Sequence, residues 1–199
     1  QNNVFFSKPI APNYCTPSYT NASPSTTYAF FKEVKINTTT HNSSTLSADG
    51  GTNYSDHSLT KKFPIDIHSS HTLDYKIESC VSSVDAVVNA WIDWNQDGIF
   101  DDITERLEVE TAINFSGSTH QRTINFDVPF FAKRGDTKMR IRVDHDDTDT
   151  YSGCTDNSQA NAGETEDYTI SISPYCLPTH SSNSCAMRIS NVSLLTIAN

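Results

Sequence analysis

The chain has 199 residues, of which 36% are hydrophobic, and a formal net charge of −10. This length suits one large β domain, or one domain with a fragment of another. No apolar run approaches the roughly 20 residues of a membrane-spanning helix, and no basic face is evident for nucleic-acid phosphates. The sequence therefore predicts neither membrane insertion nor nucleic-acid binding.

Short β-prone segments follow one another along the chain, and none of the long stretches has the 3.6-residue period of a helix. The expected strands have aromatic and β-branched content or alternate apolar with polar side chains: 28–36, 72–78, 84–93, 105–110, 121–128, 138–143 and 168–173. Residues 37–58 are expected to form a loop rich in Thr, Ser, Asn and Gly. This pattern predicts an all-β fold, an antiparallel β-sandwich with long loops.

The motif around the first cysteine returns near the end of the chain. Tyr-Cys-Thr-Pro at 14–17 recurs as Tyr-Cys-Leu-Pro at 175–178, each time followed by a polar stretch and a β-prone segment. This repeat predicts a tandem array cut early in its second copy. We therefore divide the chain into an extended lead-in at 1–13, a β-sandwich at 14–174, and the start of a second repeat or an orphan strand at 175–199. Further copies of the domain would then occur in the full-length chain.

Cysteine usage indicates the compartment. Five cysteines, at positions 15, 80, 154, 176 and 185, lie in a chain rich in Ser, Thr and Asn, which favours an oxidising environment. The polar start at Gln1 fits a mature chain whose signal peptide has been removed. We therefore expect a secreted or cell-surface protein. The odd number of cysteines means that one thiol is free or pairs outside the fragment.

The segment 93–105 places oxygen-bearing side chains at alternate positions, followed by Gly98, which permits a sharp turn. This spacing is typical of a calcium-binding EF-hand loop, except that the closing acid falls one place late and the loop leaves a strand rather than a helix. The sequence therefore predicts bound calcium, and the alternative is an acidic turn without a metal. The expected ligands are Asp93, Asn95, Asp97, the carbonyl of Ile99, and one or more of Asp101, Asp102 and Glu105.

A second acidic cluster, Glu164, Glu166 and Asp167, precedes the last expected strand, and its alternative interpretation is a solvated turn. It lies in Gly-Glu-Thr-Glu-Asp-Tyr at 163–168. Together with Trp-Ile-Asp-Trp-Asn at 91–95 and the Tyr-Cys start, this motif resembles the GEVED domain family of secreted bacterial proteins, whose signature is Gly-Glu-Val-Glu-Asp-Tyr. The resemblance covers about residues 14–174.

The resemblance implies a β-sandwich module, often repeated or attached to secreted peptidases and adhesins. From the family-like Tyr-Cys start and the place of Cys154 shortly before the signature, we also expect a disulfide between Cys15 and Cys154. The pairing of the other three cysteines stays open at this point.

These features favour a non-catalytic calcium-binding accessory or adhesion module that binds a surface, a polysaccharide or an extracellular protein. One alternative is a structural spacer, in which calcium rigidifies a tandem stalk. Another is a glycosidase or lyase that uses the acidic clusters. The sequence contains neither a His-Glu-x-x-His nor a Gly-x-Ser-x-Gly motif, and no evident apolar pocket accompanies Glu164 and Glu166. We therefore expect no catalytic activity.

Overall fold

The computed structural model describes residues 12–17, 29–43, 53–67, 69–79, 84–115, 119–145, 152–154 and 163–173. These ranges hold strands and turns, and none of them contains a helix that could cross a membrane. The strands are β1 (Ala29–Ile36), β2 (Thr39–Asn42), β3 (Tyr54–Asp56), β4 (Lys62–Asp66), β5 (Ser70–Ser79), β6 (Val84–Ile92), β7 (Arg106–Phe115), β8 (His120–Asp127), β9 (Gly135–His145) and β10 (Gly163–Ser173).

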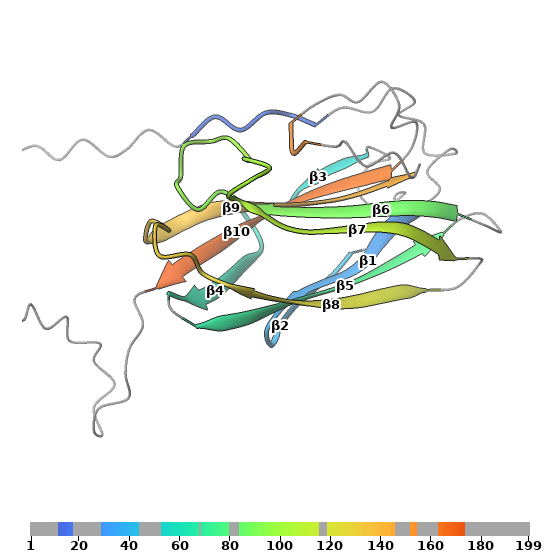
Figure 1. Ribbon diagram of the computed structural model, residues 1–199, viewed down its shortest axis with the longest axis horizontal. Coiled ribbons are helices and arrows are strands. Elements are labelled where there is room, and N and C mark those ends of the chain that lie inside the picture. The colour runs from blue at the N-terminus through green and yellow to red at the C-terminus, as the bar shows by residue number, and fades with distance from the viewer. Residues whose placement is uncertain are drawn as a thin grey trace, which may run out of the picture.

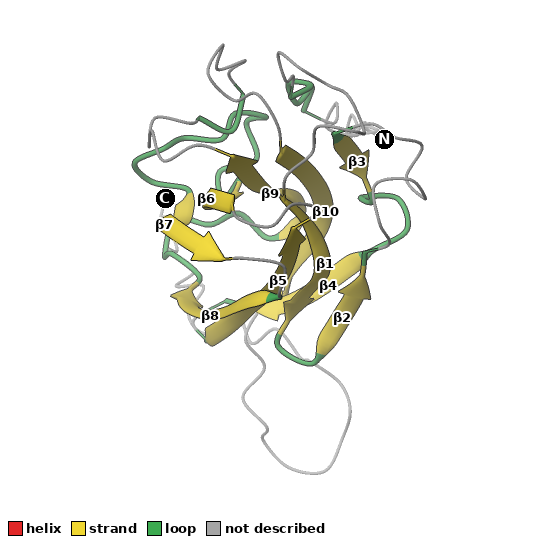
Figure 2. Cartoon of the chain, turned by 90° about the vertical axis from the view of Figure 1, so that its right-hand side faces the viewer, coloured by secondary structure: helices red, strands yellow, loops and turns green. Residues whose placement is uncertain are grey.

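Two sheets face each other, as Figures 1 and 2 show, so the predicted all-β sandwich is confirmed. The four-stranded sheet has the order β2-β1-β5-β8 and is antiparallel throughout. The six-stranded sheet has the order β3-β10-β9-β6-β7, and β4 also pairs with β10. It is mixed, because β3 and β4 both run parallel to β10 and follow each other along the same edge.

Alternating side chains build the core between the sheets. Met139, Ile141 and Val143 of β9 are completely buried, and Leu73 and Ile77 of β5 are buried in the opposite sheet. All belong to one hydrophobic cluster that spans both sheets. The period of two is what places successive apolar residues of a strand on one face, so the alternation that predicted these strands also selects their buried face.

Two predictions about strands were wrong. The expected loop at 37–58 contains β2 and β3, and the last strand begins at Gly163 rather than at Tyr168. These segments are polar, so they lack the apolar alternation by which strands are recognised. β2 and β3 form strands because their backbone groups hydrogen-bond to a neighbouring strand, β2 to β1 and β3 to β10.

Residues 12–17, called the leading segment below, cross the outer face of the six-stranded sheet (Figure 1). Cys15 is bonded to Cys154, with the two Cα atoms 5.6 Å apart, which confirms the expected disulfide. The remaining parts of the lead-in, the segment 175–199 and Cys80, Cys176 and Cys185 lie outside the described residues.

Candidate calcium loop and the buried acids of β10

The segment 93–105 joins β6 to β7 and lies against the leading segment. The ring of Phe100 stacks on that of Tyr14, with centroids 5.3 Å apart. Gly98 has a φ of +88°, and a Cβ atom there would lie only 2.8 Å from the Cβ of Pro12. Gly98 is therefore required both by its backbone conformation and by the close approach of residues 12–17.

Asp93 begins the loop and is fully buried. Its Oδ1 accepts a hydrogen bond from the amide of Asp97 (3.2 Å), and its Oδ2 accepts from the amide of Gly98 (3.0 Å) and from the hydroxyl of Tyr14 (2.7 Å). The carboxylate of Asp93 thus stabilises the first half of the loop through two backbone amides and binds the leading segment through Tyr14.

Glu105 closes the loop and is also fully buried. Its two oxygens accept hydrogen bonds from the amides of Asn95 (3.2 Å) and Asp101 (3.0 Å), so it bridges the two halves of the loop. Burial raises the pKa of Glu105 above its usual range, and the charges of Asp93 and Asp97 act in the same direction, whereas the two amides lower it. The loop therefore holds a concentrated negative potential.

The other predicted ligands lie nearer the surface. The side-chain oxygens of Asn95 and Asp97 accept hydrogen bonds from the amides of Asp97 (2.9 Å) and Ile99 (2.8 Å). Ile99 itself exposes 61% of its side chain. These short-range bonds form the successive tight turns that curl the loop.

Asp101 and Asp102 have other partners. Oδ1 of Asp101 accepts from the amides of Ile103 (3.0 Å) and Thr104 (2.7 Å), and the bonds to Thr104 and Ile103 lower the pKa of Asp101. Oδ1 of Asp102 accepts from the indole nitrogen of Trp91 at 2.9 Å. The structure thus turns Asp93 and Glu105 towards different amides within the loop, and directs Asp101 to the following turn and Asp102 to β6.

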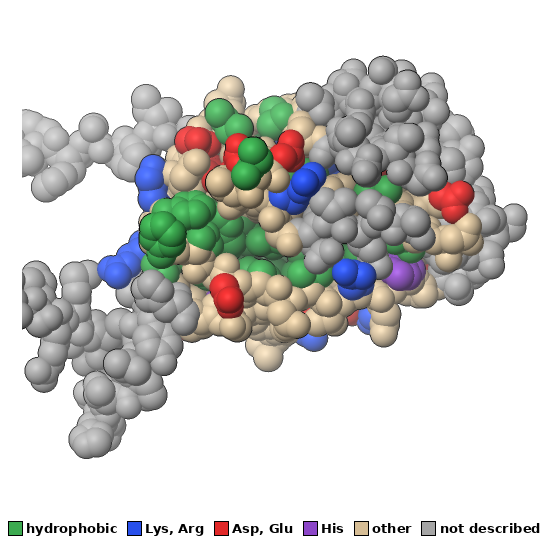
Figure 3. Space-filling model, viewed as in Figure 1, with side chains coloured by type: hydrophobic (Ala, Val, Ile, Leu, Met, Phe, Trp, Pro, Cys, Tyr) green, Lys and Arg blue, Asp and Glu red, His purple; other side chains and the backbone are tan. Residues whose placement is uncertain are grey.

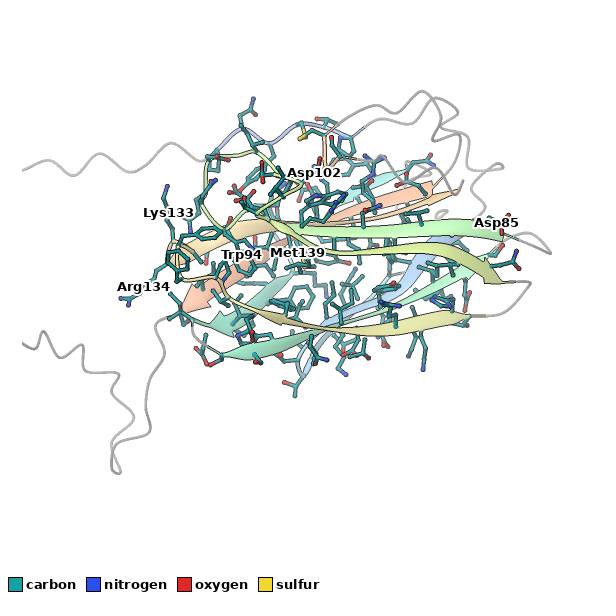
Figure 4. The ribbon with its side chains drawn as sticks, in the orientation of Figure 1. Asp85, Trp94, Asp102, Lys133, Arg134 and Met139 are labelled. Carbon is teal, nitrogen blue, oxygen red and sulfur yellow. A yellow bond between two sulfur atoms is a disulfide. The ribbon has the colours of Figure 1, made fainter. Side chains whose placement is uncertain are left out.

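A turn at residues 129–134, which connects β8 to β9, is attached to the start of this loop. The amide of Lys133 donates to the carbonyl of Trp94 (2.8 Å), and the side chain of Gln96 donates to the carbonyls of Lys133 (3.0 Å) and Arg134 (3.3 Å). The turn exposes 87% of Phe130 and 41% of Phe131. Figures 3 and 4 show an apolar patch at this end of the sandwich, with Lys133 and Arg134 there and Asp85 at the opposite end.

Sequence reasoning missed this turn. Pro-Phe-Phe at 129–131 lies between two correctly predicted strands and is followed by Lys133 and Arg134. Two consecutive aromatic residues in a connection, where apolar side chains are seldom needed for packing, were the signal that could have identified it.

The second acidic cluster is buried within β10, so its expected place before the strand was wrong, and so was the alternative of a solvated turn. Glu164, Glu166 and Asp167 have no exposed surface. Glu164 accepts a hydrogen bond from the amide of Phe31 (2.6 Å) in the opposite sheet, so it points between the sheets. Asp167 points to the other face, as the alternation of a strand requires. The three acids therefore belong to different environments.

Asp167 is the centre of a polar network on the outer face. It accepts two parallel bonds from Arg140, at 2.7 and 2.8 Å, and further bonds from Lys138 (3.0 Å) and the hydroxyl of Tyr54 (2.8 Å). Arg140 in turn donates to the carbonyl of Cys15 at 2.9 Å. Asp167, which belongs to the Gly-Glu-Thr-Glu-Asp-Tyr motif, thus positions Arg140. Arg140 in turn binds the leading segment at Cys15.

The fold and this site define the class of protein: a two-sheet β-sandwich module with an acidic loop at one end and a disulfide over one face. Residues 87–171 match the GEVED domain family, so the predicted resemblance is confirmed over that range. No curated protein matches the chain.

Several solved structures match parts of the chain. They include a family 123 glycoside hydrolase from Clostridium perfringens, at 14% identity and a TM-score of 0.38 over 58% of this chain. The match spans only 23% of that hydrolase. A CARDB domain from Pyrococcus furiosus is 10% identical, with a TM-score of 0.36 over 73% of this chain and 94% of that one. A Niemann-Pick type C2 protein from the Japanese carpenter ant is 10% identical, with a TM-score of 0.36 over 72% and 92%.

Proposed function

We propose that the chain is a calcium-stabilised, non-catalytic accessory module of a secreted bacterial protein, which binds an anionic polysaccharide through the turn at residues 129–134. One observation carries the proposal: the loop 93–105 collects buried carboxylates and is hydrogen-bonded to the turn that exposes Phe130 and Phe131. The match of residues 87–171 to the GEVED domain family supports the accessory role.

The charge balance of the loop supports a bound cation. Asp93 and Glu105 are buried, and the charges of Asp93 and Asp97 act on Glu105. Among the described residues, no ion pair joins any of these three acids to a lysine, arginine or histidine. Buried charges without compensation are costly, and a hard divalent cation with oxygen ligands would offset this repulsion.

The chemistry of the turn supports the choice of ligand. Phe130 and Phe131 offer exposed rings in a T-shaped pair, with centroids 5.7 Å apart. Lys133 and Arg134 are exposed beside them and would attract carboxylate or sulfate groups to one end of an otherwise acidic chain. Because Gln96 and Trp94 hold the turn from the loop side, calcium would keep the binding surface rigid.

Calorimetry of metal-free protein, with calcium added back alone, tests the cation. Calcium at a hundred times its Kd should add about 2.7 kcal/mol and raise the Tm by several degrees. Asp97→Ala should abolish this response, whereas Asp85→Ala, at the far end of β6, should keep it. Magnesium should substitute poorly, since it requires a strict octahedron. An unchanged Tm, together with no calcium in elemental analysis of the purified protein, would contradict the proposal.

A glycan array that contains sulfated and uronic-acid polysaccharides, probed with and without calcium, tests the ligand. The double variant Phe130→Ala/Phe131→Ala should lose binding while its Tm stays within about 2 °C of the wild type, because exposed side chains contribute little to stability. Binding to neutral glycans alone, or to extracellular proteins alone, would show that the ligand class is wrong.

A further inference from the structure

Two histidines and a glutamate meet between the two sheets, and none of the three belongs to the loop 93–105. His41 lies in β2 of the four-stranded sheet, His57 directly follows β3, and Glu166 lies in β10 of the six-stranded sheet. One ligand atom from each lies within 4.8 Å of the other two. The imidazole rings are 4.4 Å apart, and each lies 5.4 Å from the ring of Tyr168.

His41 shows what this cluster lacks. Its side chain is 8% exposed, and both ring nitrogens are buried without a hydrogen-bond partner among the described residues. A buried polar atom without a partner carries the full cost of its lost hydration. Burial also lowers the pKa of His41, and the neighbouring His57 acts in the same direction.

Glu166 is fixed in place and has little charge compensation. It has no exposed surface, and it accepts hydrogen bonds from the hydroxyl of Tyr168 (2.5 Å) and from that of Ser43. In the described structure, the only basic group that pairs with it is His57, whose Nε2 is 3.7 Å from Oε1. Asp167, one residue later, instead has both Arg140 and Lys138.

The backbone positions His57 before any ligand binds. Its amide donates to the carbonyl of Asp167 (2.8 Å), and its carbonyl accepts from the amides of Thr60 (2.9 Å) and Lys61 (2.8 Å). These bonds hold the turn that separates β3 from β4, so the imidazole is presented to Glu166 from a rigid edge of the sheet.

We propose that His41, His57 and Glu166 bind one zinc ion, which links the edge of one sheet to the other. Two imidazoles and a carboxylate are a zinc ligand set, and the hydroxyl donors Ser43 and Tyr168 would orient the carboxylate. Ligands of a tetrahedral zinc ion lie about 3.3 Å apart, given bonds of about 2.0 Å. The 3.7 Å between His57 and Glu166 is thus a small adjustment from coordination. A water molecule or a further side chain would take the fourth position.

Zinc titration of the metal-free, disulfide-bonded chain tests this site, with its free thiols blocked by iodoacetamide so that they cannot bind the metal. We expect one equivalent of zinc by elemental analysis and a Tm rise of about 5–10 °C at a hundredfold excess over Kd. His41→Gln, His57→Gln and Glu166→Gln should each remove the rise. His71→Gln is the matched control, because His71 is equally buried but bonds to Asn37 and to the carbonyl of Asp66.

The control variant His71→Gln should have a lower Tm than the wild type, and its Tm should still rise when zinc is added. Cobalt substitution should give the visible absorption of a tetrahedral site without a thiolate charge-transfer band. No bound zinc, or a zinc response retained in Glu166→Gln, would overturn the proposal and leave a His57–Glu166 ion pair as the function of the cluster. Adding zinc and calcium separately keeps this result distinct from that of the calcium loop, since the two sites share no residue.

Discussion

Asp167 and Asp144 are both completely buried beside an arginine, but their surroundings differ. Asp167 receives both nitrogens of the Arg140 fork, together with Lys138 and Tyr54. Asp144 receives one bond from Arg142, at 3.1 Å, and its Oδ2 has no hydrogen-bond partner in the described ranges. Loss of the acid should therefore destabilise the Asp167–Arg140 pair more than the Asp144–Arg142 pair.

Replacement of Asp167 should be strongly destabilising. Asp167→Asn removes the charge that compensates buried Arg140, and we expect a loss of about 3–5 kcal/mol in the free energy of unfolding. Asp136→Asn is the control. Asp136 also pairs with a basic residue, Lys62, but 58% of its side chain is exposed to solvent. That variant should lose less than about 1 kcal/mol. Urea unfolding measures both, and equal losses would show that Asp167 has no special role.

Asp144 should determine part of the pH dependence of stability. Burial raises its pKa above the unfolded value of 3.8, although Arg142 acts against this. As the pH falls, the folded state takes up this proton at a higher pH than the unfolded state does. Asp144 therefore adds stability as the pH falls from its raised pKa towards 3.8. Asp144→Asn should cost less near neutral pH than Asp167→Asn, because burial already opposes the charge of Asp144, and it should lack this acid-side gain. Urea midpoints at about pH 7 and about pH 4 measure the difference. A large loss at neutral pH would contradict it.

At the scale of elements, the acidic loop and the leading segment form one unit. Tyr14 reaches Asp93, Phe100 packs on Tyr14, and Pro12 lies against Gly98. Neither segment has a regular strand of its own, so each depends on the other for its conformation. A change that separates them should affect the proposed calcium binding and the stability together.

Substitution of Gly98 tests this dependence, with Gly135 as the control. Both glycines have positive φ, at +88° and +112°, but a Cβ at Gly135 would meet nothing within 4 Å. Gly135→Ala should therefore cost only the backbone strain, about 1–2 kcal/mol. Gly98→Ala adds the clash with Pro12 and should cost clearly more, with faster proteolysis of the leading segment. Thermal unfolding and limited proteolysis measure the two, and equal costs would show that the segments are independent.

At the scale of the whole molecule, the disulfide joins segments 139 residues apart. Closing so long a loop restricts the unfolded chain and should contribute about 5 kcal/mol by the chain-entropy estimate. The double variant Cys15→Ser/Cys154→Ser should therefore unfold at a much lower urea concentration. Reductant should lower the midpoint of the wild type in the same way and leave that of the variant unchanged. A midpoint of the wild type that does not respond to complete reduction would contradict the estimate.

The strands that could be predicted are those with an apolar face. In β9, Met139, Ile141 and Val143 alternate with arginines, and this period placed the strand correctly. The strands β2 and β3 were missed because their sequences are polar and their order comes from pairing with β1 and β10. The strand β4 was missed too, although Phe63 and Ile65 alternate in it, because it is short and contains Pro64. A polar strand lacks apolar alternation, since its stability lies in the hydrogen bonds to its partner strand.

For the candidate sites, the sequence by itself determined which residues bear oxygen ligands and how they are spaced. The alternation of Asp93, Asn95 and Asp97 before Gly98 is local, and so is the curl that it produces. Only the tertiary structure brought His41 to Glu166, because 125 positions of chain separate β2 from β10 at these residues. Local spacing can specify a loop, but a site between two sheets depends on strand order and register, which are set by packing of the whole core.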